Sequence, residues 1–243
     1  MRYGIFSDVH SNLEALEAVL AAMGEVDAYL CAGDLVGYGP NPNECVERIR
    51  NLPNLTTVVG NHDLAAVHGE GLEWFNLHAQ AAVLWTQEAL TPESREFLAN
   101  LPERVIVDDI TVVHGSLVDP MDYITSPYEA QATFDLMTTP ICLIGHSHIA
   151  EYYRVRDDSR FAAQVELFNG GEVDIEPGYR YIINLGGVGQ PRDGNPRAAF
   201  GSYDTDRRLV TAARVEYPIA QTQAKMEAAG LPPLLIHRLE VGR

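Results

Sequence analysis

The chain has 243 residues, 46% of them hydrophobic and 21% charged, which is ordinary for a folded globular protein with a substantial core. Its 17 basic and 34 acidic residues give a formal net charge of −17 without any Lys/Arg-rich stretch, which disfavours general electrostatic binding to nucleic acid or to an anionic membrane. No apolar run approaches the roughly 18–20 residues that span a bilayer, and Met1 leads straight into a strand-like segment without room for a signal peptide, so we expect one cytoplasmic domain over residues 1–243.

The first part of the chain alternates short apolar strands with helices. Residues 3–6 are typical of a strand, and Ser11 or Asn12 is suited to cap a helix whose apolar residues from Leu13 to Met23 fall on one face. The pattern continues with a strand at 28–32, a Gly/Pro-rich loop at 37–42, a helix at 44–50 and a strand at 56–59. This alternation indicates a sheet flanked by helices.

The pattern becomes helical after Asp63. The segment from Phe75 to Leu90 is helical and rich in aromatic residues, and a second helix opens at Thr91 and Pro92, because proline is favoured at the first helical position. We interpret residues 64–102 as a helical insertion beside the loop ends.

Strands return after the insertion. Residues 105–107 and 110–113 flank a polar Asp-Asp turn, which predicts a hairpin. A helix at 127–137 and an apolar strand at 141–144 follow. From Glu151 onward strands dominate, so we expect a second, mostly antiparallel sheet.

The segment 219–243 is predicted to be a C-terminal helix and tail. The helix covers residues 219–229 and is stopped by Gly230 and by the prolines at 232 and 233. The remaining residues to Arg243 are expected to be loosely held.

The three cysteines are predicted to be buried thiols. Cys31, Cys45 and Cys142 are odd in number and form no Cys-x-x-Cys spacing, and Cys31 and Cys142 lie in apolar runs. Packing therefore explains them better than a metal or redox role.

Side chains of metal-ligand type follow several of the predicted strands. The set consists of Asp8, His10, Asp34, Asn61, His114, His146 and His148. Ligands on rigid strand ends fix the geometry of a catalytic metal while leaving a position open for water. Asp8 and His10 have the same strand parity, so both are expected to point towards one ion, and the two oxygens of Asp34 suit a bridge between two ions.

The mixture of donors indicates which metals and which reaction to expect. Nitrogen and oxygen together favour Mn, Fe, Zn, Ni or Co over Mg and Ca, which prefer oxygen alone. Two such ions about 3.5–4 Å apart hold a hydroxide nucleophile and polarise a phosphoryl oxygen. The expected reaction is phosphate-ester hydrolysis.

Five motifs in order resemble the calcineurin-like metallophosphoesterase superfamily. They are Asp8-x-His10, Gly33-Asp34, Gly60-Asn61-His62-Asp63, His114 and Gly145-His146-Ser147-His148. The resemblance covers about residues 1–205 and implies an α/β (α+β) fold, a four-layer sandwich of two mixed sheets flanked by helices. By resemblance, Asp8, His10, Asp34 and His148 hold the first metal, with manganese foremost, and Asp34, Asn61, His114 and His146 hold the second.

The resemblance also implies a proton donor and a branch of the superfamily. His62, followed by Asp63, looks like the general acid that protonates the leaving oxygen, and a paired aspartate would raise its pKa. The segment 184–197 resembles a loop of the small bacterial and archaeal phosphodiesterase branch, although Leu185-Gly186-Gly187 replaces the Pro-Gly-Ser expected there. The loop after Gly33-Asp34 lacks the arginine usual in protein phosphatases and symmetrical dinucleotide hydrolases, which disfavours both assignments.

Other residues near these motifs have two interpretations each. His68 and His78 either approach the site or sit on the surface, and packing is favoured. Tyr38, Trp74, Phe75 and Trp85 either stack on a base or pack the inserted helices. Arg192 and Arg197 either clamp a distal phosphate or stabilise a turn.

The expected substrate is a small phosphate ester or a nucleotide, with metal-dependent phosphodiesterase or phosphatase activity. One alternative is a nucleoside polyphosphate hydrolase, including asymmetrical cleavage of diadenosine tetraphosphate. A nuclease is disfavoured by the charge of −17, and a non-catalytic scaffold, like a retromer subunit of this superfamily, is disfavoured by the complete ligand set. The sequence sets neither the native substrate nor the oligomeric state.

Overall fold

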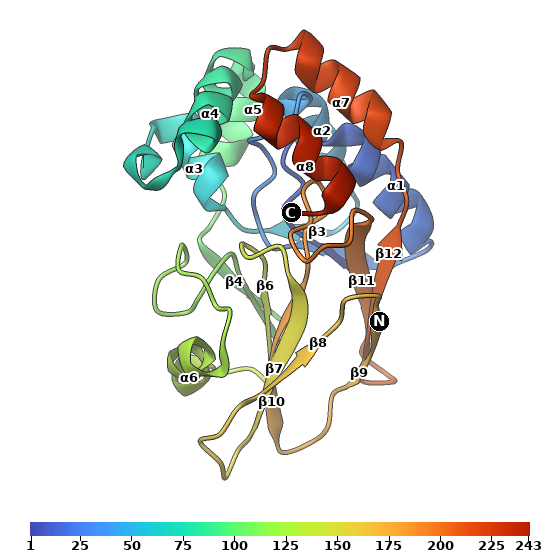
Figure 1. Cartoon of the computed structure of the whole chain (residues 1–243). Helices are drawn as coiled ribbons and strands as arrows, with labels where there is room; N and C mark the ends of the chain where they lie inside the picture. The colour runs from blue at the N-terminus through green and yellow to red at the C-terminus, as the bar shows by residue number, and fades with distance from the viewer.

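Two mixed β-sheets of six strands each pack face to face in the computed structural model, which describes all residues from 1 to 243 (Figure 1). The first sheet has the order β3 (Leu55–Thr57), β2 (Ala28–Cys31), β1 (Arg2–Phe6), β11 (Ala198–Asp204), β12 (Leu209–Val215) and β9 (Gly171–Asp174). The second has the order β4 (Arg104–Val107), β5 (Ile110–Val113), β6 (Ile141–Ile144), β10 (Tyr179–Leu185), β7 (Ala150–Arg156) and β8 (Ala163–Glu166). One buried cluster contains side chains from both sheets, including Tyr3, Leu30, Val112 and Ile183, so the core lies between them.

The parallel parts of the sheets place the strand ends that matter for function. Strands β1, β2 and β3 are parallel to one another in the first sheet, and β5, β6 and β10 are parallel in the second. Parallel neighbours end at the same edge of a sheet, where loops that follow the strands can form a common site.

Eight α-helices flank the sheets, and all but one gather at the same end of the molecule (Figure 1). They are α1 (Leu13–Met23), α2 (Pro42–Arg50), α3 (Asn61–His68), α4 (Leu77–Ala89), α5 (Pro92–Ala99), α6 (Pro127–Leu136), α7 (Ile219–Ala228) and α8 (Pro233–Val241), with a short 3-10 helix η1 (Leu72–Trp74) before α4. The exception is α6, which packs against β7 and β10 of the second sheet.

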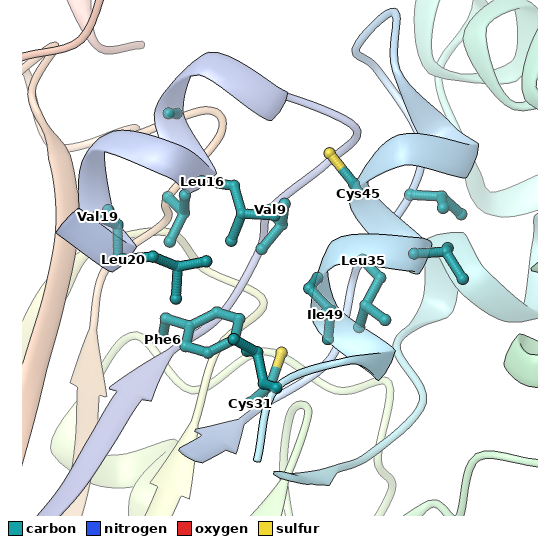
Figure 2. Packing of buried hydrophobic residues seen from close by; sticks show 14 of the residues in the cluster. Phe6, Val9, Leu16, Val19, Leu20, Cys31, Leu35, Cys45 and Ile49 are labelled. Carbon is teal, nitrogen blue, oxygen red and sulfur yellow. The ribbon is translucent and has the colours of Figure 1, made fainter. Parts of the chain in front are cut away.

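The helices α1 and α2 cover the first sheet through a second buried cluster (Figure 2). Leu16, Val19 and Leu20 recur at helical spacing on α1 and belong to the same cluster as Phe6 of β1. The Asn12 side chain accepts a hydrogen bond from the Ala15 backbone and caps the helix. This packing holds the loops after β1 and β2 against a rigid layer.

The expected elements are confirmed for the hairpin of β4 and β5, for the helices of residues 64–102 and for α6. All three cysteines are free and buried, as expected. None of the helices combines the length and apolarity that crossing a bilayer would require.

Two expectations about the C-terminal half are wrong. The strands after Glu151 do not form a separate antiparallel sheet, because β7, β8 and β10 join the second sheet whereas β9, β11 and β12 join the first. The tail is not loosely held either: residues 233–241 form α8, whose Leu235, Ile236 and Leu239 are buried. The second proline of Pro232-Pro233 occupies the first turn of that helix, where proline starts a helix as readily as it stops the preceding one.

Candidate metal centre

Seven candidate ligands follow parallel strands, six of them in loops and Asn61 at the start of α3. Asp8 and His10 follow β1, Asp34 follows β2, Asn61 follows β3, His114 follows β5, and His146 and His148 follow β6. All are buried except Asn61, which is half-buried. The fold therefore brings together side chains that are separated by up to 140 positions, from Asp8 to His148.

The backbone at this centre adopts an unusual conformation. Five of the candidates have positive φ angles: Asp8 (54°), His10 (48°), Asp34 (54°), His146 (67°) and His148 (59°). The strand-parity argument for Asp8 and His10 is therefore wrong, since β1 has ended at Phe6 and left-handed turns aim both side chains. Such conformations cost on the order of 1 kcal/mol or more each and are concentrated at functional sites.

The donor atoms form two groups that share Asp34. Asp8, His10, Asp34 and His148 make one group, and Asp34, His114 and His146 make the other, with the donor atoms of each group within 4.8 Å of one another. The Asn61 Oδ1 atom lies 3.2 Å from the His114 Nε2 atom, beside the second group. One carboxylate placed between two donor groups is the arrangement expected for a pair of neighbouring cations.

Hydrogen bonds to main-chain carbonyls orient three of the histidine rings. The Nδ1 atoms of His10, His114 and His148 lie 3.0, 2.7 and 2.5 Å from the carbonyl oxygens of Val36, Ala32 and Gln190. Since a carbonyl only accepts, Nδ1 of each ring carries a proton, and Nε2 is the atom that faces the site. The Nε2 atoms of His10 and His148 are only 3.1 Å apart, a contact between two lone pairs that a cation would relieve.

Two buried polar atoms at the centre lack hydrogen-bond partners. They are Oδ2 of Asp34 and Nε2 of His146. The same Asp34 oxygen lies 3.5 Å from Nε2 of His10 and 3.3 Å from Nε2 of His114. Buried polar groups are rarely left unsatisfied, so these atoms fit a bound metal ion as their partner.

Burial controls the protonation of the ligand set. It lowers the pKa of His10 and of His146 to about 3, so both rings are neutral and able to coordinate. Burial also raises the pKa of Asp8, to about 6. At His114 burial acts to lower the pKa, but the Asp34 carboxylate outweighs it and raises the pKa to about 9. A proton between Asp34 and His114 thus occupies a position that suits a cation.

His62 lies beside this centre, but Asp63 does not pair with it. The Asp63 carboxylate accepts hydrogen bonds from the backbone N–H groups of Val36 and Gly60, both 3.0 Å away, and so caps α3. The expected Asp63–His62 pair is therefore wrong: neighbouring side chains on a helix point about 100° apart. His62 Nδ1 is buried without a partner, and burial lowers the pKa of the ring well below its ordinary value.

A cavity of about 720 Å³, here called the mouth pocket, opens beside the metal centre. His62, His146 and Asn61 lie at its base, and Tyr38, Trp74, Phe75, Tyr123, Arg192 and Arg238 are among the residues of its walls. The walls come from η1 and its link to α4, from α4 and α8, and from the loops after β2, β5 and β10. This volume is sufficient for a small organic molecule.

The aromatic residues that had two interpretations differ in whether they line the mouth pocket. Tyr38 and Phe75 contact His62, with ring centroids 4.3 and 4.6 Å away, and Trp74 is 85% exposed at the rim. Trp85 instead packs against the buried cluster between α4 and α8.

Among the charged residues, Arg192 lines the pocket, whereas Arg197 bonds Asn169 and Asn195 outside it. His68 and His78 are exposed and do not line the pocket.

Sequence reasoning missed two residues of the pocket. Tyr123 stacks on His146 with ring centroids 3.8 Å apart, and Arg238 projects from α8. Neither belongs to a motif. The proline at the start of α8 was the one signal for Arg238, because it indicated a further helix rather than a tail.

Comparison with known proteins identifies the family of the chain and two related proteins. Residues 1–208 match the model of the calcineurin-like phosphoesterase superfamily domain. The chain is 46% identical to a metallophosphoesterase from Sphaerobacter thermophilus, whose crystal structure superposes with a TM-score of 0.90 and covers 100% of this chain and 99% of that one. It is also 36% identical over 250 residues to an uncharacterized protein of Methanocaldococcus jannaschii, covering 98% of this chain and 97% of the relative.

A more distant structure shares the fold. It belongs to a candidate diadenosine tetraphosphatase that is 17% identical, with a TM-score of 0.52, and the match covers 88% of this chain and 94% of that one. At this identity the likeness extends to the architecture alone.

Proposed function

Because this chain belongs to the calcineurin-like phosphoesterase superfamily, we propose that it hydrolyses phosphate mono- or diesters of small molecules with two divalent metal ions. The observation that carries the proposal is the sharing of Asp34 by two buried donor groups. Asp8, His10, Asp34 and His148 would hold one ion, and Asp34, Asn61, His114 and His146 the other. Manganese is the first choice, with iron, zinc, nickel or cobalt as alternatives, because the donors are mixed nitrogen and oxygen. Two such ions supply charge neutralisation at the phosphate and lower the pKa of water that attacks it.

The residues of the chain then have separable roles. The three main-chain carbonyls that bond Nδ1 of His10, His114 and His148 hold the rings in their coordinating orientation. His62 lies at the base of the pocket with Nδ1 free of hydrogen bonds, and we assign it as the proton donor to the leaving oxygen. Burial lowers the pKa of His62, whereas a bound phosphate acts in the opposite direction because its negative charge favours the protonated ring. Asp63 supports this role only indirectly, by capping the helix that carries His62.

The proposal is tested with p-nitrophenyl phosphate and bis(p-nitrophenyl) phosphate. The purified protein should hydrolyse at least one of them when loaded with Mn²⁺, lose the activity on chelation and recover it when Mn²⁺ is returned. Absence of metal-dependent turnover on both esters and on nucleotide substrates would reject the proposal.

A nucleoside polyphosphate hydrolase is the second candidate. It is favoured by the mouth pocket, which combines exposed aromatic rings, Trp74 and Tyr123, with Arg192 and Arg238. The comparison is the turnover of diadenosine tetraphosphate against that of p-nitrophenyl phosphate under the same metal loading. Asymmetrical cleavage yields ATP and AMP, and chromatography of the products distinguishes it from symmetrical cleavage to ADP.

A further inference from the structure

The Arg192 guanidinium contacts Tyr38, whose ring in turn lies against histidines of the metal centre. Its guanidinium carbon is 5.7 Å from the centroid of the Tyr38 ring, and one of its nitrogens donates to the Tyr38 hydroxyl at 3.2 Å. The same Tyr38 ring lies 4.7 Å from His10 and 4.3 Å from His62, measured between centroids. The main-chain N–H of Arg192 also donates to the carbonyl oxygen of His148, so the residue is anchored beside the ligand cluster while its guanidinium lies against Tyr38 in the pocket.

Arg238 reaches the same pocket from α8. Its Nε atom donates to the carbonyl of Arg243. Arg192 and Arg238 line the same cavity, and burial together with the positive charge of Arg192 lowers the pKa of Arg238. Two like charges held together in a partly buried wall are unfavourable without an anion between them.

Neither arginine has an aspartate or glutamate partner. No Asp or Glu oxygen lies within 4.0 Å of either guanidinium, whereas Arg154, Arg180 and Arg214 all have such ion pairs. In addition, Nε of Arg192 is buried without a hydrogen-bond partner. Arg192 thus has an unused donor, and no acidic side chain pairs with either of these two arginines that line the pocket.

The acidic residues of the pocket do not neutralise this pair. Glu70, Asp119 and Asp122 also line the cavity, but all three are exposed to solvent. Charges in water are strongly screened, so they affect a bound anion less than the half-buried arginines do. The cationic side of the pocket remains available to a ligand.

We propose that Arg192 and Arg238 form a second anion subsite, which binds a phosphate group linked directly to the phosphate that is hydrolysed. The inference rests on the proposed hydrolase function and narrows its substrates to compounds with two or more adjacent phosphates. With ADP, water attacks the terminal phosphorus, the bond from that phosphorus to the bridging oxygen breaks, and the oxygen leaves with its electron pair as AMP. Arg238 lies outside residues 1–208, the segment that matches the family model, so this subsite depends on a helix beyond that segment.

The kinetic test compares ADP with AMP as substrates of the manganese-loaded protein. Arg238→Gln is expected to lower the ratio of kcat/KM for ADP to that for AMP by about tenfold or more, since a charge-assisted hydrogen bond to the inner phosphate is lost. Arg192→Gln should lower the ratio further, and Arg238→Lys should restore part of it because the charge is kept. Arg197→Gln is the matched control, since Arg197 follows on the same loop but bonds Asn195 and Asn169. A ratio that stays within about twofold of wild type in Arg238→Gln would overturn the subsite.

A binding measurement separates this proposal from the hydrolase proposal. Calorimetric titration with methylenediphosphonate, which has two linked anionic groups and resists hydrolysis, should give about tenfold tighter binding than methylphosphonate, and Arg238→Gln should abolish the difference. Equal binding of both probes by wild type would also refute the subsite. If the wild-type protein hydrolysed no phosphoester but showed the difference in binding, the proposed hydrolase function would be rejected and the anion subsite would be supported.

Discussion

The metal centre and the mouth pocket differ in how the chain builds them. At the centre, six of seven candidate ligands are buried, and three histidine rings are fixed by hydrogen bonds to main-chain carbonyls. At the pocket, Trp74 is 85% and Tyr123 51% exposed, and the walls come from η1, α4, α8 and loops. The side chains of the centre are therefore fixed in position by the ends of the strands. The pocket is formed by peripheral segments, whose exposed side chains can be substituted with little effect on the fold.

This difference indicates where chemistry and selectivity reside. A catalytic centre needs ligands held within about 0.5 Å, which buried backbone contacts provide. Selectivity among esters needs only contacts that differ between substrates, and exposed side chains supply these at low cost to stability. Substitutions at the centre should therefore abolish activity on all esters, whereas substitutions at the pocket should change the relative activity on different esters.

The sharpest test of the centre is Asp34→Asn. Loss of the shared carboxylate charge should reduce metal binding in both donor groups and lower kcat/KM by about a thousandfold or more. Metal analysis of the purified variant together with ester hydrolysis provides the measurement. Asp135→Asn, an exposed change on α6, serves as the control. Full metal content with normal activity in Asp34→Asn would contradict the shared-ligand arrangement.

His62→Ala tests the boundary between the two regions. The variant should retain both metals but lose about 10²- to 10⁴-fold in kcat, with the largest loss on esters whose leaving groups are poor, since these most need a proton. A series of aryl phosphates of increasing leaving-group pKa measures the effect, with the exposed His78→Gln as reference. Loss of metal in His62→Ala would instead make His62 a structural residue.

The next largest effect is expected on stability, from a substitution that weakens the packing of α8. Leu239 is 3% exposed and packs in the cluster that joins α4, α7 and α8, whereas Leu234 on the same helix is 57% exposed. Leu239→Ala should lower the free energy of unfolding by about 2–5 kcal/mol, and Leu234→Ala by less than about 0.5 kcal/mol. Denaturant unfolding measures both. Similar values for the two variants would mean that α8 is not held by this cluster.

Trp74→Ala should have the smallest effect. An exposed ring contributes little to folding, so the melting temperature should stay unchanged, while KM for a nucleotide substrate should rise about two- to tenfold if the ring stacks on the base. Phe161→Ala removes an equally exposed aromatic ring away from the pocket and is the control, with exposures of 91% for Phe161 and 85% for Trp74. Equal effects of the two substitutions on KM would exclude stacking by Trp74.

The sequence predicted which candidate ligands the fold brings together, because their position in the chain is a local signal. Each candidate ligand comes soon after the end of a strand, and parallel strands end at one edge of a sheet. What the sequence could not give was the backbone conformation: the left-handed φ angles of Asp8 and His10 depend on hydrogen bonds from their N–H groups to the carbonyls of Gly33 and Asp34, which only the folded chain brings close.

The errors in the prediction have local physical causes. Asp63 stands three residues after Gly60, which is the spacing of a residue that caps a helix, and this local bond prevailed over a pair with the adjacent His62. The sequence pattern predicts that Pro233 ends a helix and that Arg238 lies in a tail, whereas Pro233 begins α8 and Arg238 is part of that helix. The sheet assignment of β9, β11 and β12 depends on long-range pairing, for which the alternating pattern of each strand carries no information.

The three buried cysteines can be used to detect local unfolding of the protein. All are buried, and burial raises the pKa of Cys31 and of Cys142 to about 12, so a thiol reagent should leave the folded protein unlabelled. Cys31 at the end of β2 and Cys45 on the buried face of α2 belong to the cluster under α1 (Figure 2), and Cys142 lies in the cluster that α6 covers. The order in which the thiols become modified during heating would therefore reveal which outer layer detaches first.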